Sequence, residues 1–137
     1  MCVAVLVPAP ASGSGSAYLR LEYRRAMEIA VVGAAASVTL AADGSVAAVR
    51  VALTAVAPTI LEVTGLGGGS VADVAAAARA AASEQARPIS DVRASDRYRR
   101  HTVGVMAQRA VEAAARRAAG TPVPVPVNRA LGIGAAS

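Results

Sequence analysis

The feature that most constrains the fold is the dipeptide Asp43-Gly44, which lies between two runs of alternating side chains. From Glu28 the chain becomes strand-like, and its apolar and polar residues alternate with the period of two of a half-buried strand. The alternating positions are Ala36, Ser37, Val38, Thr39 and Leu40. The run from Val46 to Ala57 returns with Val49, Val51 and Leu53 inward and Arg50 and Thr54 outward, and Pro58 ends it. Because Asp and Gly both tolerate positive φ, the sequence predicts a long β-hairpin.

Glycine and small residues in the first strand of this hairpin predict a close neighbour. Gly33 and the alanines at 34–36 leave room on the strand, so another element is expected to pack closely over its first half. The sequence contains no Phe or Trp, and much of its 55% hydrophobic content is alanine. The core is therefore expected to consist of Val, Leu, Ile, Met and Ala, with elements that approach one another closely.

Two amphipathic helices are predicted after the hairpin and a short strand at Ile60–Val63. Ser70 is a good N-cap for the first helix, which ends before Pro88. Its apolar stripe is Val71, Val74, Ala75, Ala78 and Ala82. Ser95 caps the second helix, which can run to Gly120. The second stripe is Val103, Met106, Ala107, Ala110 and Ala114.

The segments that flank this region divide the chain into three parts. Residues 1–16 are interpreted as an N-terminal strand remnant (Val3–Val7) and a flexible connector rich in Pro, Ser and Gly, which resembles a junction with an upstream domain. Residues 17–119 form the domain itself. Within it, the segment from Tyr18 to Arg25 is compatible with a short helix or with an extended chain. Residues 120–137 are a Pro/Gly-rich tail that is expected to lie extended over a surface or to be mobile.

Composition argues against several classes of protein. The longest uncharged stretches, residues 29–42 and 51–61, are shorter than the roughly 20 apolar residues of a membrane span. The N-terminus lacks the basic region of a secretory signal, and Cys2 is the single cysteine. A soluble cytoplasmic protein is predicted. The net charge is +5 and every basic side chain is Arg, but the arginines spread around the second helix without interleaved aromatics, so nucleic-acid binding is not predicted.

Few residues suggest chemistry. Gly65–Gly69 precedes a helix, so it could bind phosphate, but it lacks the Lys-Ser/Thr of a P-loop and is also compatible with a plain flexible loop. His101 has no Cys, Asp or Glu at ligand spacing, and Cys2 has no His or Asn context. No catalytic residue and no metal site are therefore predicted.

Two groups of arginines need partners. Arg99 falls inside the apolar stripe of the second helix, where a guanidinium requires a carboxylate or carbonyl groups, and Asp91 is the first candidate and Glu28 the second. The pair Arg24-Arg25 is compatible with a surface salt bridge or with an interface contact.

Three segments together resemble a known family. These are YLRLEYRRAMEIAVVGAAASVTL, DGSVAAVRVALTAVAPT and ARPISDVRASDRYRRHTVGVMAQRAVEAA, in order between residues 18 and 118. They resemble the C-terminal domain of the FAD-binding (medium) subunit of molybdenum hydroxylases, the aerobic carbon monoxide dehydrogenase and xanthine dehydrogenase type. The resemblance implies an α+β fold, an antiparallel sheet packed against a small helical bundle, in agreement with the hairpin and the two helices.

The resemblance also implies a role. The parent oxidoreductase subunit holds FAD and passes electrons between iron–sulfur clusters and an acceptor, while most FAD contacts come from an upstream domain. This chain would then be a non-catalytic domain that binds no cofactor alone, closes one side of the flavin site and assembles with FAD-binding, iron–sulfur and molybdenum partners. Self-association is left open. The alternative is a stand-alone protein-interaction module with the same fold and no flavin role.

Individual residues can be carried over from the family pattern. Those expected on the flavin side are Arg25, Met27, Glu28 and Ile29, which match Arg-x-Met-Asp-Ile-Ala except that Glu28 replaces Asp. Those expected to be structural are Asp91, Arg93, Tyr98 and Arg99, which match the Asp-x-Arg and Tyr-Arg-Arg pattern. The chain departs from the family between Leu61 and Ser70, where the family usually has an extra helical segment.

Overall fold

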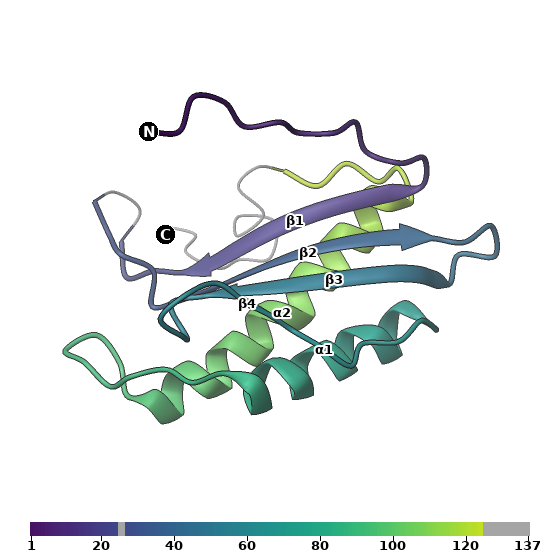
Figure 1. Cartoon of the computed structure of the whole chain (residues 1–137). Coiled ribbons are helices and arrows are strands. Elements are labelled where there is room, and N and C mark those ends of the chain that lie inside the picture. The colour runs from purple at the N-terminus through teal and green to yellow at the C-terminus, as the bar shows by residue number, and fades with distance from the viewer. Residues whose placement is uncertain (25–26, 125–137) are drawn as a thin grey trace.

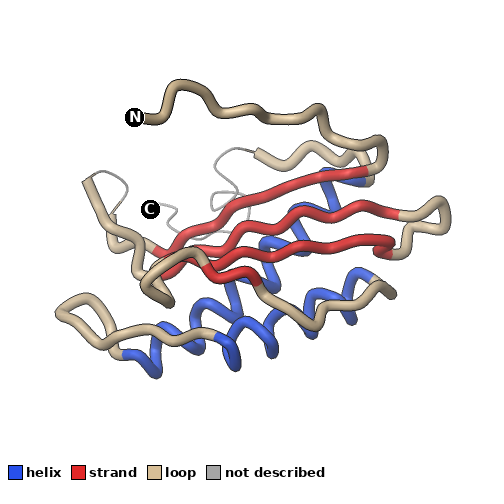
Figure 2. The backbone as a smooth tube through the Cα atoms, viewed as in Figure 1, coloured by secondary structure: helices blue, strands red, loops and turns tan. Residues whose placement is uncertain are grey.

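The computed structural model describes residues 1–24 and 27–124. A four-stranded antiparallel sheet, in the order β1-β2-β3-β4, carries two helices on one face (Figures 1 and 2). The strands are β1 (Ser14–Leu21), β2 (Val32–Leu40), β3 (Val46–Thr54) and β4 (Leu61–Glu62). The helices are α1 (Val71–Gln85) and α2 (Asp96–Ala118). The predicted α+β class, with an antiparallel sheet built on a long hairpin, is confirmed.

The hairpin is formed by β2 and β3, and Ala36 pairs with Val51 at its centre. Gly44 has a φ of 81°, and the Asp43 carboxylate accepts hydrogen bonds from the Ser45 amide and hydroxyl at 2.9 and 2.6 Å. The predicted inward residues Val51 and Leu53 are fully buried. The hairpin strands are shorter than predicted. β2 starts at Val32 and not at Glu28, and β3 ends at Thr54 because Ala55 adopts a left-handed φ of 61°.

The first strand decides between the helix and the extended chain for Tyr18–Leu21, because β1 is extended through Leu21 and pairs with β2. Two sequence predictions are wrong. Ser14–Ser16 is not part of a connector, since the Gly13 carbonyl accepts the Leu40 amide at 2.9 Å and brings the chain into the sheet. Residues 3–7 are not a strand, since the described chain offers them no pairing partner, and their large apolar side chains are exposed.

The core lies between the sheet and α2, which crosses beneath β1 and β2 and packs along α1 (Figure 1). It consists of Val, Leu, Ala and Met side chains, as predicted, but the predicted isoleucines of the described chain do not contribute, since Ile29, Ile60 and Ile89 are exposed. Two glycines allow close approach. A Cβ atom on Gly15 would lie 2.4 Å from the Ala114 carbonyl oxygen, and one on Gly104 would lie 2.8 Å from the Arg79 carbonyl oxygen. The alanine-rich composition is thus matched by tightly spaced backbones.

Both predicted helix caps are present. The Ser70 hydroxyl accepts the Asp73 amide and the Ser95 hydroxyl accepts the Tyr98 amide, each at 3.2 Å. α1 ends without a basic residue in its last turn, and its final carbonyls are bonded by Arg87 and Arg100. α2 ends two residues before Gly120, which has a φ of 79°. No helix in the described part of the chain is long and apolar enough to cross a membrane.

Candidate functional site

Three connections meet at one end of the sheet, opposite the Asp43-Gly44 turn (Figure 1). They join β1 to β2, β3 to β4, and α1 to α2, and their described residues are 22–24 with 27–31, 55–60, and 86–95. We call this region the loop end. The Arg87 amide donates to the Val56 carbonyl at 2.8 Å, and the Tyr23 hydroxyl donates to the Arg93 carbonyl. A hollow of about 370 Å³ lies where the three loops meet.

Arg99 ties the three loops together from the first turns of α2. It is only 3% exposed. One terminal nitrogen donates to the Val31 carbonyl at 2.7 Å and to the Ala55 carbonyl at 3.3 Å, and the other donates to Asp91 Oδ1 at 2.7 Å. The predicted Asp91 partner is confirmed. The second candidate, Glu28, is wrong, because its carboxylate pairs with Arg24 at 3.1 Å.

Asp91 is the anionic centre of this arrangement. Its Oδ1 accepts the Arg93 amide at 2.8 Å and the Ala94 amide at 3.2 Å, and its Oδ2 pairs with the Arg93 guanidinium at 2.8 Å. The hydrogen bond from the Arg93 amide and then the one from Arg99 lower the pKa of Asp91 from 3.8 to about 2. Asp91 therefore stays ionised throughout the physiological pH range.

The predicted structural residues are only partly brought together. Asp91, Arg93 and Arg99 form one ion-paired cluster. Tyr98 lies beside them on the first turn of α2 with its side chain exposed, and its carbonyl accepts the Thr102 hydroxyl at 2.8 Å. Their structural role remains a prediction that these contacts support.

The residues predicted on the flavin side lie in the β1–β2 connection. Met27 is 97% exposed and has a left-handed φ of 52°, which is uncommon outside glycine. Ile29 is also exposed, whereas the Glu28 side chain turns toward Arg24 and is only 13% exposed. Arg25 lies outside the described residues. Of the described candidates, two apolar side chains therefore point to solvent and the acidic one does not.

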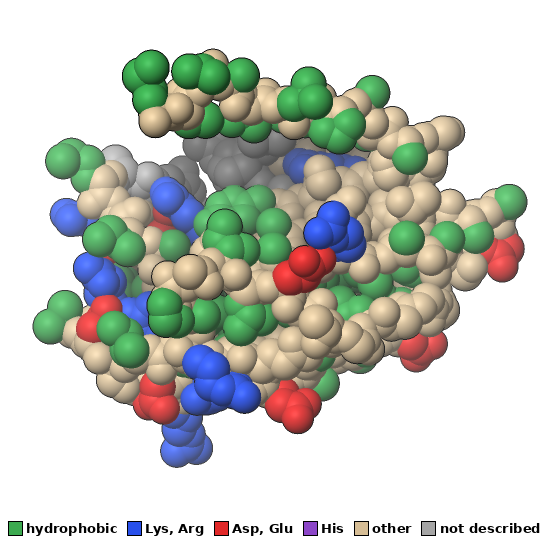
Figure 3. All heavy atoms as spheres, in the orientation of Figure 1, with side chains coloured by type: hydrophobic (Ala, Val, Ile, Leu, Met, Phe, Trp, Pro, Cys, Tyr) green, Lys and Arg blue, Asp and Glu red, His purple; other side chains and the backbone are tan. Residues whose placement is uncertain are grey.

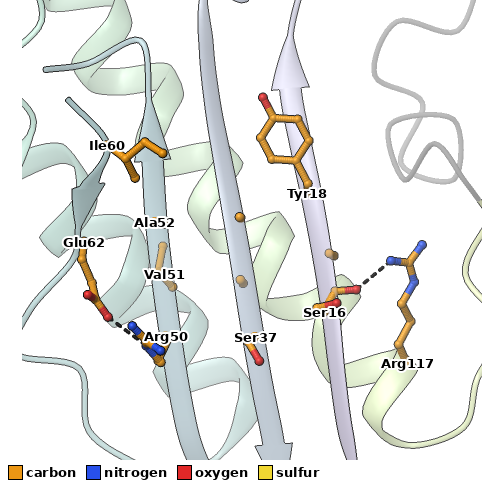
Figure 4. Close-up of a pocket in the computed structure, with 12 residues that line it drawn as sticks. Ser16, Tyr18, Ser37, Arg50, Val51, Ala52, Ile60, Glu62 and Arg117 are labelled. Carbon is orange, nitrogen blue, oxygen red and sulfur yellow. Dashed lines mark hydrogen bonds and ion pairs between the residues drawn. The ribbon is translucent and has the colours of Figure 1, made fainter. Parts of the chain in front are cut away.

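A second surface lies on the sheet face that the helices leave uncovered. Its hollow, of about 750 Å³, has a floor of small side chains between Tyr18 and Ile60 on one side and charged groups on the other (Figures 3 and 4). The Arg50–Glu62 pair, at 2.9 Å, and Arg117, which donates to the Ser16 carbonyl at 2.6 Å, supply those charges. Ile60 also belongs to the loop end, so the two surfaces adjoin.

Gly33 shapes this uncovered face. A Cβ atom there would lie 2.5 Å from Thr54 Oγ1 and 2.7 Å from Tyr18 Oη, so the phenol and the threonine both lie over the glycine. The predicted close packing over the first half of the strand is confirmed. The hollow itself was missed, because Tyr18 could be placed on the sheet only once β1 was known to be a strand.

The remaining candidates are the potential metal ligands and the glycine run before α1. No group of three or more His, Cys, Asp or Glu side chains that could hold a metal occurs in the described parts of the chain. In the glycine run, Gly69 exchanges backbone hydrogen bonds with Val46, and a Cβ atom on Gly68 would lie 2.6 Å from the Val46 carbonyl oxygen. The Gly69 amide thus donates to a sheet carbonyl and is not free to bind a phosphate, which favours a linker over a phosphate loop.

Comparisons with known proteins agree with this architecture. The family described as the CO dehydrogenase flavoprotein C-terminal domain matches residues 17–114. A structure of carbon monoxide dehydrogenase from Hydrogenophaga pseudoflava, lacking the Mo-pyranopterin moiety of its cofactor, is similar with a TM-score of 0.73 and 34% identity. The match covers 81% of this chain and 40% of that one. A search of curated protein sequences finds no match.

Two further solved structures are similar. Reconstituted CO dehydrogenase from Oligotropha carboxidovorans gives a TM-score of 0.73 and 34% identity, over 81% of this chain and 40% of that chain. Quinoline 2-oxidoreductase from Pseudomonas putida 86 gives a TM-score of 0.72 and 29% identity, and the match covers 82% of this chain and 40% of that chain. The chain therefore spans about 40% of the length of the chains it matches.

The antiparallel sheet with two helices is an α+β fold that matches the flavoprotein C-terminal domain of CO dehydrogenase, a molybdenum hydroxylase. The chain belongs to the CO dehydrogenase flavoprotein C-terminal domain family. Between Leu61 and Ser70, where the family resemblance implies an extra helical segment, the structure has β4 and no helix.

Proposed function

We propose that this chain closes one side of a flavin site in an FAD-dependent molybdenum hydroxylase and is not catalytic alone. The observation that carries the proposal is the family match over residues 17–114, which includes the loop end and all residues lining the hollow of the uncovered sheet face except Ser16 and Arg117. The three similar structures are molybdenum hydroxylases, which supports a parent oxidoreductase assembled from several subunits.

The uncovered sheet face suits contact with a planar ring system. Small side chains, Ala35, Ser37 and Ala52 among them, line the hollow together with the larger Tyr18 and Ile60 (Figure 4). The β1–β2 connection, with exposed Met27 and Ile29, adds an apolar margin. An FAD-binding domain resting here would leave the isoalloxazine ring covered by small and apolar side chains, which exclude water from it.

The cofactor would be held mainly by the partner. When bound there, FAD supplies the electron transfer between the iron–sulfur and molybdenum subunits and an external acceptor. The residues of this chain would cover the ring and position the partner. Arg117 offers positive charge at one side of the hollow, whereas the charge of Arg50 is offset by Glu62. Arg25, Met27, Glu28 and Ile29 remain the residues proposed on the flavin side by family resemblance.

A binding experiment tests the proposal. We expect the purified chain alone to bind no FAD at micromolar concentration, and to bind the FAD-loaded FAD-binding domain of a molybdenum hydroxylase medium subunit. Ala52→Leu fills the floor of the hollow and should weaken that binding at least tenfold. Ala48→Leu is the matched control, because Ala48 lies on the same face of β3 but outside the hollow, toward the hairpin turn.

Two results would point elsewhere. Micromolar FAD binding by the chain alone would contradict a purely covering role. Failure to associate with FAD-binding, iron–sulfur and molybdenum subunits on co-expression would favour the alternative, a protein-interaction module with the same fold and no flavin role.

A further inference from the structure

Arg99 is the one side chain that contacts all three connections of the loop end through its own hydrogen bonds among the described residues. Its acceptors, Val31 O, Ala55 O and Asp91 Oδ1, belong to three different loops and lie 68, 44 and 8 residues away in sequence. A guanidinium is a rigid planar fork, so fixing its two ends fixes the relative positions of the groups that it joins. A lysine ammonium is a single point and cannot reproduce that spacing.

The first of these contacts fixes the return of the β1–β2 connection. Val31 is fully buried, its amide donates to the Leu21 carbonyl at 2.8 Å and its carbonyl accepts Arg99 at 2.7 Å. Both backbone polar groups of Val31 are thus engaged, two residues after the exposed Ile29. The position of Ile29 at the surface therefore depends on a contact made in the interior.

The second contact lies at a strained residue. Met27 and Ala55 are the non-glycine residues with positive φ in the described chain, and they occupy two of the loops that Arg99 joins. Left-handed conformations of such residues persist only where the surrounding structure fixes them. The Ala55 carbonyl is itself an Arg99 acceptor, so the arginine contributes directly to holding this conformation.

The arrangement is not optimal for stability alone. Arg99 Nε is buried and has no hydrogen-bond partner among the described residues, which leaves a desolvated donor. Buried ion pairs can often be replaced by apolar side chains without loss of stability. What an apolar side chain cannot supply is a fixed geometry between two carbonyls and a carboxylate, and that geometry sets the walls of the hollow at the loop end, Ile29 and Ile89 among them.

We propose that Arg99 is a positioning residue for flavin-site closure. It acts through Val31, Ala55 and Asp91 to hold Met27 and Ile29 where they meet the partner. This inference rests on the proposed function and adds to it the interior group that orients the closing surface.

The test compares Arg99→Met and Arg99→Lys with Val111→Ala. Val111 is fully buried in the middle of α2, so its truncation lowers stability without touching the loops. All variants are measured well below their unfolding temperatures. The first readout is the rate at which FAD leaves the FAD-loaded FAD-binding domain in the presence of each variant. We expect FAD to leave at least tenfold faster in the presence of either Arg99 variant than in the presence of the wild-type chain. With Val111→Ala, the release rate should stay within twofold of the rate with the wild-type chain.

The second readout needs no partner. Amide hydrogens of residues 27–31 and 55–58 should exchange at least tenfold faster in Arg99→Met than in Val111→Ala. Equal exchange in the two variants would overturn the positioning role whatever the partner does. Faster exchange in Arg99→Met, combined with no slowing of FAD release by the wild-type chain, would sustain the loop-positioning role of Arg99 and count against the proposed function instead. Arg99 variants that exchange faster yet protect FAD as well as wild type would overturn the inference and leave the proposed function intact.

Discussion

The two ends of the sheet are held in different ways. At the hairpin end, the Asp43 carboxylate bonds Ser45 two residues away and Gly44 adopts the positive φ of the turn. At the loop end, Arg99 bonds Val31 and Ala55 from 68 and 44 residues away. One end is specified by adjacent residues, and the other exists only once the whole domain has folded. Mutations should therefore have larger and more widespread effects at the loop end.

The largest effect is expected from Arg99→Ala. It removes three hydrogen bonds and leaves Asp91 with only Arg93 and two amides, so the free energy of unfolding should fall by about 3 kcal/mol. Urea unfolding measures this loss. Arg116→Ala, on the exposed last turn of α2, is the control and should change stability by less than about 0.5 kcal/mol. A loss that small for Arg99→Ala would show that the three loops do not depend on it.

A smaller effect is expected at the hairpin end. Gly44 has a φ of 81° and open space around it, so Gly44→Ala costs only the left-handed conformation of an alanine, about 1 kcal/mol. Gly67→Ala is the matched control, because Gly67 also has open space but no positive φ. Thermal unfolding of the two variants should separate them, and equal stabilities would mean that the turn adapts to a side chain.

The smallest effect is a pH dependence at the loop end. The pKa of Asp91 is lowered to about 2 in the folded chain, so its ionised form stabilises the fold above the unfolded value near 3.8. That stabilisation is lost as the pH falls from about 4 toward 2. We expect the unfolding temperature of Asp91→Asn to change less with pH over this interval than that of the wild type. The amides of the hairpin turn should remain as protected from hydrogen exchange as in the wild type. If the unfolding temperature of Asp91→Asn falls with pH as steeply as that of the wild type, the pH dependence comes from another carboxylate.

The hairpin and both helices could be predicted because their information is local. Ser70 and Ser95 cap helices through amides three residues away, and the turn needs only Asp43, Gly44 and Ser45. The Asp91–Arg99 pair was also predictable, since a charged residue within an apolar helical stripe needs a partner and Asp91 lies eight residues before it.

The site as a whole could not be predicted in the same way. Nothing near Arg99 in sequence indicates Val31 or Ala55, because backbone carbonyls carry no residue identity. The hollow on the uncovered face depends on the register that brings Ala35 opposite both Tyr18 and Ala52, which alternation alone does not set. For residues 3–7 the sequence predicted a strand that the structure does not have. Their composition is typical of a strand, but no strand of the described chain lies beside them to pair with.

The most direct test of the account is the solvent accessibility of a partner's flavin. Collisional quenching of flavin fluorescence by iodide would be measured on the FAD-loaded FAD-binding domain, with and without saturating wild-type chain. The account predicts that the chain lowers the quenching constant several-fold, and that Ala52→Leu restores most of it while Ala48→Leu does not. An unchanged quenching constant in a complex that demonstrably forms would contradict the claim that this domain closes the flavin site.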